Sequence, residues 1–551
     1  MRAKDESNSP SVRAISFMIG SDAVQPRSNR PRRIHKMPDQ RFNLLSEPLF
    51  TVDAGGGTPP LLTLPGVLSR LARGEPTDFH ALQPHQQHAW HAFTVQVAAL
   101  AIHASGNETP PDSEDTWRTM LLGLTGGDDA PWCLVVGDLS KPAFMQPPVP
   151  ERTLNGWSET ASPDEIDILV TARNHDVKSS RIAAPSPEHW IYALVTLQTM
   201  SGFDGQKNYG IARMNGGYGN RPCVAASPNL LPALRFQRDL EVLLAARERM
   251  IEDYGYQRNG GAALLWVIEW GGGRDEQLPL DDCDPFFIEV ARRVRLAWES
   301  SSIVCYRKGS EAPRVNAEQR KGDLGDPWVP VRHDGASLTA KNLSYRTLHK
   351  ILFSADYATN PARRVLPEDG ETPVLVAQVF ARGQGKTEGY HERYIPIPRE
   401  ARAFFVQPDP HSQLALLAGD FIKSVDELQN KVLKPALLTL LQGDPEKLDF
   451  KDERAKPQID ALDSAVDQIF FARLFALSGR SDALEEWKKE ILGLAENVLR
   501  EAFDSVPIPL ARRYRAIAVA ERKFNGAARK FAPQLYVREE DSDGRPGTTT
   551  D

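Results

Sequence analysis

Up to about residue 400, the spacing of hydrophobic positions changes repeatedly between the period of a strand and that of a helix. Apolar residues three or four positions apart indicate an amphipathic helix, whereas alternating or short continuous apolar runs indicate a strand. The expected helices cover residues 83–104, 187–200 and 231–254. The expected strands cover residues 49–52, 131–136, 263–270, 286–296, 301–308, 374–380 and 393–397. This mixture predicts a large mixed α/β domain over residues 37–400.

After residue 400 the strand patterns disappear and long helical patterns follow. Four helices are expected, at residues 412–441, 456–477, 483–503 and 510–531. Short turns rich in Gly and Pro separate them, and short connections join antiparallel neighbours. We therefore expect residues 401–535 to form an up-down four-helix bundle. The predicted fold class is α+β, with the mixed domain first and the bundle at the C-terminal end.

Both ends of the chain differ from the rest in composition. Residues 1–36 hold eight Lys or Arg against three acids, with frequent Ser, Pro and Asn and no periodicity, so we predict a disordered extension. Met37 directly precedes the first folded pattern, which favours a start-site artefact with Met37 as the initiator. The alternative is a basic arm that binds nucleic acid. Residues 536–551 are acidic and are predicted to be a disordered tail.

The composition of the 551 residues is that of a soluble globular protein, with 41% hydrophobic and 25% charged residues. The four cysteines are scattered and form no CxxC pair, which excludes a zinc ribbon and fits a reducing, cytoplasmic location. No apolar run approaches the 18 residues of a membrane span, so no membrane partner is expected. Because the net charge is −7, any contact with nucleic acid must come from local basic patches.

One such patch lies in the glycine-rich segment at residues 201–222, which has six glycines between Gly202 and Gly219. Lys207, Arg213 and Arg221 are interleaved with them. Glycine lets a backbone approach a partner closely, and exposed N–H groups beside Lys and Arg form a cradle for anions. This combination suits a phosphate backbone or a groove of nucleic acid. The alternative is a long structural loop made of glycine turns.

The last predicted helix is a second basic patch. Its seven cations are Arg512, Arg513, Arg515, Arg522, Lys523, Arg529 and Lys530. Glu521 is its one acid, so seven minus one gives a charge of +6 within a chain of net −7. This asymmetry predicts a surface that follows a phosphate backbone. The alternative is a basic helix face that is merely solvated.

Residues 383–387, GQGKT, resemble the end of a phosphate-binding Walker loop. The full motif requires Gly at position 380, where this chain has Phe380. We therefore favour an exposed hairpin tip whose Arg382, Gln384 and Lys386 can touch bases or phosphates. A stand-alone NTPase around Lys386 is kept as the alternative.

Two further clusters of polar residues carry candidate chemistry. His85, His88 and His91 follow one another at intervals of three residues, which makes a poor tetrahedral metal site. No metal or cofactor is expected, and a metal-dependent hydrolase at His85 and His88 remains an alternative. Residues 171–181, with Arg173 and Lys178, are predicted to be a polar loop that binds RNA or a neighbouring protein.

The order of these features resembles the large subunit of the type I-E CRISPR Cascade surveillance complex over about residues 40–535. The resemblance starts at FNLLSEPLFTV and continues through KPAFMQ at residues 141–146 and SGFDG at residues 201–205. It ends with GQGKTEGYHER at residues 383–393 and the helical bundle. Each motif alone is weak, whereas the ordered set is specific.

The resemblance implies a non-catalytic subunit that reads the protospacer-adjacent motif (PAM) of double-stranded DNA and helps to separate the strands. Sequence specificity in such complexes comes from pairing with the guide RNA. The implied partners are CRISPR RNA, target DNA, a helicase-nuclease, and the backbone, handle-binding and small subunits of Cascade. A glycine backbone fits this task because side chains would clash in a narrow minor groove.

The resemblance also assigns roles to individual residues. PAM binding falls to the glycine loop, to a lysine finger at Lys308 with Arg307 as the alternative, and to a wedge at Gln384 between Gly383 and Gly385. The loop residues concerned are Gly202, Phe203, Asp204, Gly205 and Lys207. Asp204 stands where relatives often have Gly, so its carboxylate is expected to alter the PAM preference.

Two further groups complete the implied interface. Phe144, Met145 and Gln146, preceded by Ala143 where Pro was expected, would contact the RNA handle or the backbone subunit, as would Arg173 and Lys178. The bundle would guide displaced DNA along its phosphates. The bundle residues concerned are Arg512, Arg513, Arg515, Arg522 and Lys523.

Overall fold

The computed structural model describes residues 42–53, 59–168, 182, 184–217, 221–339, 342–383 and 386–536. All of these belong to one compact unit, which is distinct from Met1–Pro38. The predictions for residues 1–36 and for the tail from residue 537 lie outside the described residues. The same holds for Arg173, Lys178, Gln384 and Gly385.

Among the described residues, the strands lie in the first three quarters of the chain. They are β1 (Phe50–Asp53), β2 (Leu61–Leu62), β3 (Asp78–Phe79), β4 (Ser158–Thr160), β5 (Cys223–Ser227), β6 (Ala262–Leu264), β7 (Leu278–Pro279), β8 (Cys283–Ile288), β9 (Arg293–Glu299), β10 (Ser302–Lys308), β11 (Val315–Asn316), β12 (Val374–Gly383) and β13 (Lys386–Pro396). Three sheets have three strands, in the orders β2-β1-β3, β4-β10-β9 and β13-β12-β5. The pairs β6-β8 and β7-β11 are parallel.

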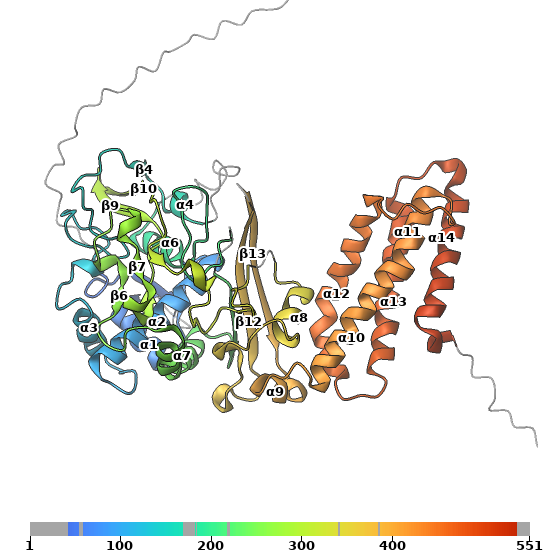
Figure 1. Ribbon diagram of the computed structural model, residues 1–551, viewed down its shortest axis with the longest axis horizontal. Helices are drawn as coiled ribbons and strands as arrows, with labels where there is room; N and C mark the ends of the chain where they lie inside the picture. The colour runs from blue at the N-terminus through green and yellow to red at the C-terminus, as the bar shows by residue number, and fades with distance from the viewer. Residues whose placement is uncertain are drawn as a thin grey trace, which may run out of the picture. The chain divides into compact units, whose positions relative to one another are not determined.

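Helices occur throughout the described residues and become continuous toward the C-terminal end. They are α1 (Leu64–Ala72), α2 (Gln87–Ser105), α3 (Glu114–Gly123), α4 (Pro163–Ile166), α6 (Pro187–Met200), α7 (Pro232–Tyr254), α8 (Tyr345–Phe353), α9 (Arg399–Val406), α10 (Gln413–Glu427), α11 (Lys434–Gln442), α12 (Lys456–Leu477), α13 (Ala483–Ser505) and α14 (Leu510–Phe531). Figure 1 shows β12 and β13 as a long hairpin beside α8. The predicted α+β fold class is confirmed.

Two elements illustrate how the pattern of residues produces the fold. Helix α2 is apolar on nearly all sides, as expected of a helix in the middle of a core, and Trp90, Phe93 and Val97 are all buried. Strand β10 pairs antiparallel with β9 along its whole length, so the expected pairing of residues 301–308 with the preceding strand is confirmed. This pairing positions Lys308 at the end of a three-stranded sheet.

Three predicted strands differ from the structure. Residues 131–136 form no strand: Ala130–Trp132 is a 3₁₀ helix, and Cys133 makes a single bridge to Asn43. Residues 286–296 are divided between β8 and β9, and only the first residues of 263–270 belong to a strand, β6. The physical reason is burial, because a short apolar run in a core has the same pattern whether it is extended or not. Trp266, for example, is buried and donates through Nε1 to the carbonyl of Pro131 at 3.0 Å.

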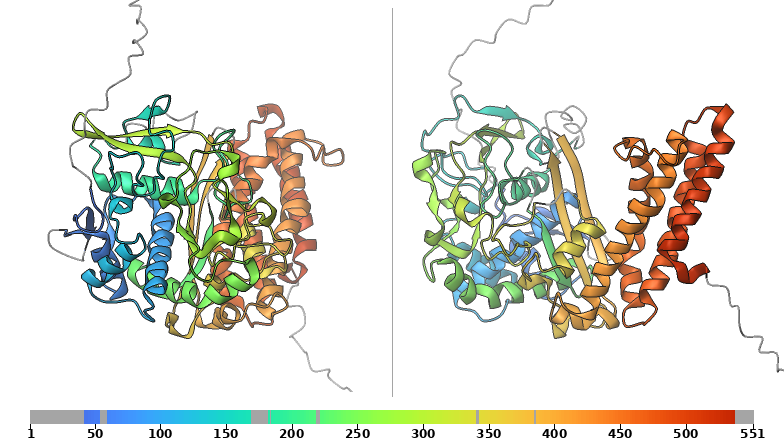
Figure 2. Two further views of the ribbon diagram at one scale, coloured as in Figure 1. Left: turned by 60° about the vertical axis from the view of Figure 1, so that its left-hand side comes forward. Right: turned by 45° about the vertical axis from the view of Figure 1, so that its right-hand side comes forward.

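The predicted helical bundle is present. The first predicted helix is continuous from α10 through a π-helical segment at Leu428–Leu433 to α11, and α12 and α14 have the predicted bounds. The helices from α10 to α14, coloured orange to red, run side by side in both views of Figure 2.

The core of the bundle continues into the preceding sheet. One cluster of buried side chains contains Leu375 and Val379 of β12, Phe405 of α9, and Phe421 and Trp487 of the bundle. The rings of Phe421 and Trp487 are stacked with their centroids 4.4 Å apart. The expected boundary at residues 400–401 falls inside α9. The division into domains at this boundary stays a prediction, and the side chains on its two sides share one core.

Candidate nucleic-acid interface

The glycine loop, residues 202–209, follows directly after α6 and forms a tight turn. The amide of Asp204 donates to the carbonyl of Asn208 at 2.9 Å, and the amide of Asn208 donates to the carbonyl of Gly205 at 3.0 Å. Gly205 has φ +96°, and no described atom lies within 4 Å of the place where its Cβ would be. A left-handed backbone in open space favours glycine, so the tip of the loop can approach a partner closely.

The glycine loop is interlocked with the end of β10. The amide of Ser310 donates to the carbonyl of Lys207 at 3.1 Å. A Cβ on Gly309 would lie 2.6 Å from the Cβ of Lys207, so only glycine permits this approach. As a result Lys308, at the end of β10, stands beside the glycine loop although the two segments are about a hundred residues apart in the sequence.

Together they line one concave site, a cavity of about 410 Å³. Its charged lining residues are Glu165, Asp167, Asp204, Lys207, Arg292, Arg293, Arg307 and Lys308. Five cations minus three acids give a formal charge of +2. A concave surface with excess positive charge attracts anions, because its walls concentrate the field.

Arg292, which lines the cavity, and Glu151, which contacts two of the lining cations, are two residues that the sequence alone did not single out. Arg292 donates through Nη2 to the carbonyl of Gly202 at 3.0 Å and through Nη1 to that of Tyr209, so it holds both ends of the glycine loop. Glu151 accepts from Lys308 Nζ at 2.9 Å and from Arg293 Nη2 at 2.9 Å. Partial burial alone would raise the pKa of Glu151, but the hydrogen bonds from Lys308 and Arg293 outweigh it and lower the pKa to about 2.

Lys308 and Arg307, the two residues expected as a lysine finger, both line the cavity. Lys308 is 41% exposed at its side chain. Arg307 is half-buried and donates through Nη1 to the carbonyl of Glu165 at 3.4 Å. The more exposed Lys308 is the better placed of the two to meet a partner.

Two arginines of the glycine-rich segment do not contribute to an anion cradle, which corrects the sequence-based expectation. Arg213 and Arg221 are 4% and 1% exposed. Arg213 forms an ion pair with Glu289 at 3.0 Å, and Arg221 forms one with Asp326 at 2.5 Å. Since their guanidinium groups are buried and neutralised inside the fold, Lys207 is the exposed cation that remains in the described part of this segment.

The predicted hairpin around residues 383–387 is confirmed. Strands β12 and β13 pair antiparallel up to Gly383 and Lys386, with a bulge at Ala381 and Arg382. A Walker loop requires a strand followed by a helix, whereas a strand follows here. Phe380, at the position where the motif needs Gly, is fully buried within β12. The NTPase alternative is therefore contradicted by the local fold.

The hairpin is anchored close to the cavity through a histidine. The ring of His85 lies against Phe380 of β12 with 6.2 Å between centroids. The same imidazole bonds through Nε2 to Asp167, which lines the cavity, at 2.8 Å. One wall of the cavity is thus tied to β12.

Phe144, Met145 and Gln146 are fully buried, which corrects the expectation of a surface loop. Gln146 donates through Nε2 to the carbonyls of Leu134 and Phe144, each at 2.9 Å, and accepts from the amide of Leu296 at 2.6 Å. These bonds satisfy buried backbone groups, so the three side chains stabilise the core and do not present themselves to RNA or to another subunit.

The basic residues of α14 are mostly exposed. Arg512, Arg515, Arg522 and Lys523 face solvent, while the half-buried Arg513 donates to the carbonyl of Phe503 at 2.9 Å. At about 100° per residue, six of the seven cations lie within an arc of roughly 120° on the helix. They are Arg512, Arg515, Arg522, Lys523, Arg529 and Lys530. Helix α14 therefore presents one continuous positive stripe.

The three histidines near the start of α2 turn toward different partners. His85 bonds to Asp167, whereas His91 bonds through Nε2 to Asp239 at 2.8 Å. Burial lowers the pKa of His88 to about 3 and that of His91 to about 4. Within the described ranges no group of three or more His, Cys, Asp or Glu is arranged to hold a metal ion. These contacts disagree with a hydrolase centre at His85 and His88.

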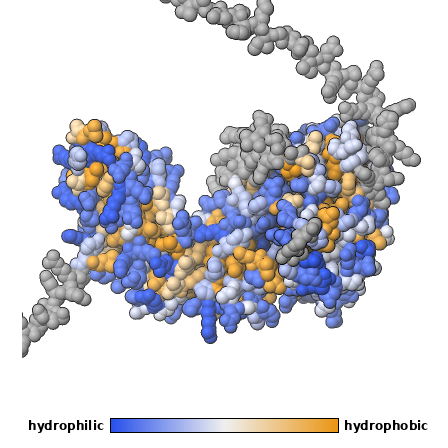
Figure 3. All heavy atoms as spheres, turned by 180° about the vertical axis from the view of Figure 1, so that it is seen from behind, coloured by the Kyte–Doolittle hydropathy of each residue, from blue (hydrophilic) through white to orange (hydrophobic). Residues whose placement is uncertain are grey.

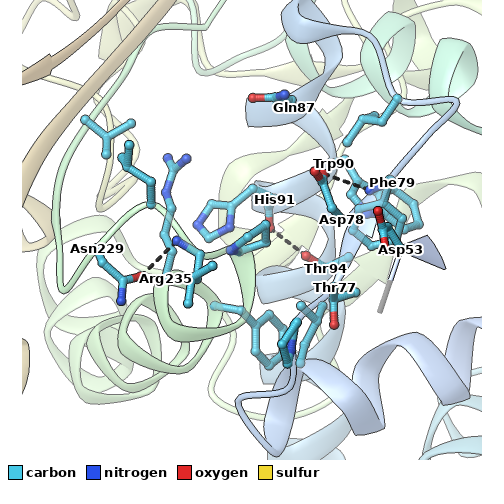
Figure 4. A pocket seen from close by; sticks show the side chains of 18 of the residues that line it. Asp53, Thr77, Asp78, Phe79, Gln87, Trp90, His91, Thr94, Asn229 and Arg235 are labelled. Atoms are coloured by element: carbon cyan, nitrogen blue, oxygen red, sulfur yellow. Dashed lines mark hydrogen bonds between the residues drawn. The ribbon is translucent and has the colours of Figure 1, made fainter. Parts of the chain in front are cut away.

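His91 also faces a second cavity, of about 480 Å³, lined by Trp90, Asp78 and Arg235 among others (Figure 4). In this view Arg235 lies on one side of His91, while Asp53 and Asp78 lie on the other. Among the residues drawn, neutral His91 has no Ser or Cys nucleophile beside it. The Thr94 hydroxyl beside it donates to the backbone carbonyl of His91 at 2.9 Å, not to its imidazole.

The surface seen in Figure 3 is mostly hydrophilic, and hydrophobic side chains are scattered over it in smaller patches. Searched over the residues with a described position, the helices include none that is long and apolar enough to cross a membrane.

No protein-family model and no curated protein matches the chain. Solved structures do match it over nearly its whole length. CasA of Thermus thermophilus is 17% identical with a TM-score of 0.59, covering 89% of this chain and 100% of that one. The CRISPR-associated protein Cse1 of Acidimicrobium ferrooxidans is 16% identical with a TM-score of 0.60, covering 90% and 99%.

Cse1 of Thermobifida fusca is 14% identical with a TM-score of 0.59, covering 90% of this chain and 98% of that one. Identities this low show a shared fold, and the coverage shows that the fold is shared as a whole. The chain therefore has the fold of the CRISPR-associated protein CasA (Cse1).

Proposed function

We propose that this chain is the non-catalytic large subunit of a type I-E Cascade complex and that it recognises the PAM in double-stranded DNA. One observation carries the proposal: in the fold of Cse1, the open glycine loop and Lys308 line the same positively charged cavity. The CRISPR RNA would supply the sequence specificity, and this chain would read only the short adjacent motif.

The two parts of the cavity suit different parts of a duplex. The minor groove is about 6 Å wide and admits a glycine backbone more readily than side chains. The open tip at Gly205 meets that requirement, and Lys308 can reach a base edge or a phosphate from beside it. Asp204, next to this tip, is exposed and would accept from a base amine such as the N2 of guanine.

Strand separation and the path of the displaced strand involve two other elements. We assign the wedge to Gln384, because Gly383 and Lys386 pair at the end of the β12–β13 hairpin. We assign the displaced strand to the positive stripe of α14, because exposed cations in a row follow a phosphate backbone. The remaining proposed partners are the helicase-nuclease and the other Cascade subunits.

The test uses the complex assembled by co-expression with the other Cascade subunits and a CRISPR RNA. Lys308→Ala and Gln384→Ala should weaken binding to a duplex with the PAM while leaving assembly with RNA intact. Lys350→Ala, an exposed lysine on α8 that does not line the cavity, is the matched control. Normal PAM-dependent binding by both variants would refute the assigned site, and PAM-selective binding without this subunit would refute the proposed function.

A further inference from the structure

Lys308 shares its carboxylate partner with a second cation. Glu151 Oε1 accepts from Lys308 Nζ at 2.9 Å, and both Glu151 oxygens accept from Arg293 Nη2 at 2.9 Å. The three groups form a triad with a formal charge of +1. Glu151 comes from a segment about 150 residues before Lys308, so the tertiary fold creates this arrangement.

The two cations of the triad are held very differently. The side chain of Arg293 is 3% exposed, and its guanidinium lies over the ring of Trp157, 4.9 Å from the centroid. The side chain of Lys308 is 41% exposed and ends on the cavity wall. Arg293 is fixed inside the protein, whereas Lys308 can leave the triad by a rotation of its flexible side chain.

Because of this difference, little free energy is needed to move the Lys308 side chain out of the triad. An ion pair that loses one partner normally leaves the other charge without compensation, which is costly where the group is buried. Here Glu151 would keep both contacts with Arg293 after Lys308 has left, so the charges of Glu151 and Arg293 would still compensate each other. The energy needed to release Lys308 is then only that of a partly exposed ion pair.

We propose that Glu151 is a resident acceptor, which holds the Lys308 ammonium beside the glycine loop in the free protein and competes with DNA until an acceptor on DNA replaces the carboxylate. The inference rests on the proposed function, because it presupposes that Lys308 meets DNA. The contact between Gly309 and Lys207 fixes the backbone on both sides of the cavity, so only the end of the Lys308 side chain has to move.

The test is a double-mutant cycle on DNA binding by the assembled complex. Glu151→Gln should tighten binding to duplex DNA by about 1.5- to 5-fold, because that is the worth of a partly exposed ion pair. When Lys308 is already replaced by Met, Glu151→Gln should tighten binding to DNA much less. The introduced amide oxygen would still accept from Arg293. Glu151→Asp, which keeps the charge but withdraws it from Lys308, covers the case that the first variant does not fold.

Glu165→Gln is the matched control, since Glu165 lines the same cavity and meets Arg307 through its backbone carbonyl, not through its carboxylate. An equal gain from Glu165→Gln, or an undiminished gain from Glu151→Gln without Lys308, would overturn the inference in favour of a general charge effect. If Lys308→Met alone leaves binding unchanged, the proposed site itself fails. If Lys308→Met weakens binding but neither Glu151 variant tightens it, only the role of Glu151 is refuted.

Discussion

The glycine-rich segment and α14 are both basic in sequence, yet they use their cations in opposite ways. In the first, Arg213 and Arg221 are buried and paired with Glu289 and Asp326. In the second, Arg515 and its neighbours on the stripe face solvent. Arginine tolerates burial when carboxylates and aromatic rings surround it, and here Phe287 and Trp328 provide rings for Arg213 and Arg221. A bundle helix has one side that no other element covers, so its cations stay available to a ligand.

The largest expected effect tests the buried side of this comparison. Asp326→Ala removes the partner of Arg221 and also an acceptor for the amide of Trp328. Because it removes the carboxylate that pairs with the buried Arg221, we expect a loss of about 3–5 kcal/mol in the free energy of unfolding. Chemical denaturation of the purified chain measures it. A change below about 0.5 kcal/mol would mean that these arginines are not structural.

A smaller loss of stability is expected from the core loop that the family resemblance assigns to RNA. Gln146→Ala leaves the buried amide of Leu296 and two carbonyls without their partner. The total cost should be about 1–3 kcal/mol, the penalty of one buried group that stays unsatisfied, because the space left by the side chain lets water bond to the others. Thermal denaturation gives the result, and assembly of the folded variant with CRISPR RNA should be unaffected. A stable variant that fails to assemble would restore the assignment to RNA.

The exposed side of the comparison is tested on α14. Replacing Arg512, Arg515 and Arg522 together by Ala should change the free energy of unfolding by no more than about 0.5 kcal/mol per residue. Binding to DNA should become less dependent on salt, with the slope of log K against log salt reduced by about 2 for three contacts to a single strand. Titrations between low and physiological salt measure this slope. An unchanged slope would show that the stripe is only solvated.

The smallest expected effect is on the stability of the folded state at acidic pH. The pKa of Glu151 is lowered from 4.5 to about 2, so its ion pairs stabilise the folded state fully above pH 4.5. This contribution is lost as the pH falls from 4.5 toward 2, because the unfolded chain takes up the proton first. The difference in melting temperature between the native chain and Glu151→Gln should therefore shrink over this window. A constant difference would show that the triad does not persist in solution.

Local features were predicted well where they depend on residues close together in the sequence. The bounds of α12 and α14 follow from the helical spacing of apolar positions and from the turns that flank them. The hairpin follows from alternation on both sides of glycines. The strand expected at residues 131–136 was wrong, because a buried apolar run carries no period that separates a strand from a 3₁₀ turn.

The candidate site was predicted only in part, for a different reason. The glycine loop and Lys308 were named from motifs, but nothing local shows that Gly309 packs on Lys207 or that Arg292 holds both ends of the loop. The motif at residues 144–146 was recognised, yet its burial depends on contacts with Leu134 and Leu296. A motif identifies a segment, and its environment decides which side chains remain exposed.

By itself, the sequence determined the alternation of strands and helices before residue 400, the helical bundle after it, and the positions of its basic and glycine-rich segments. These properties depend on hydrophobic periodicity and backbone preferences, which act over a few residues. Only the tertiary structure decided which cations stay exposed and which carboxylates they meet. Burial and charge pairing depend on groups far apart along the chain, as Glu151 and Lys308 are, and those distances close only when the chain folds.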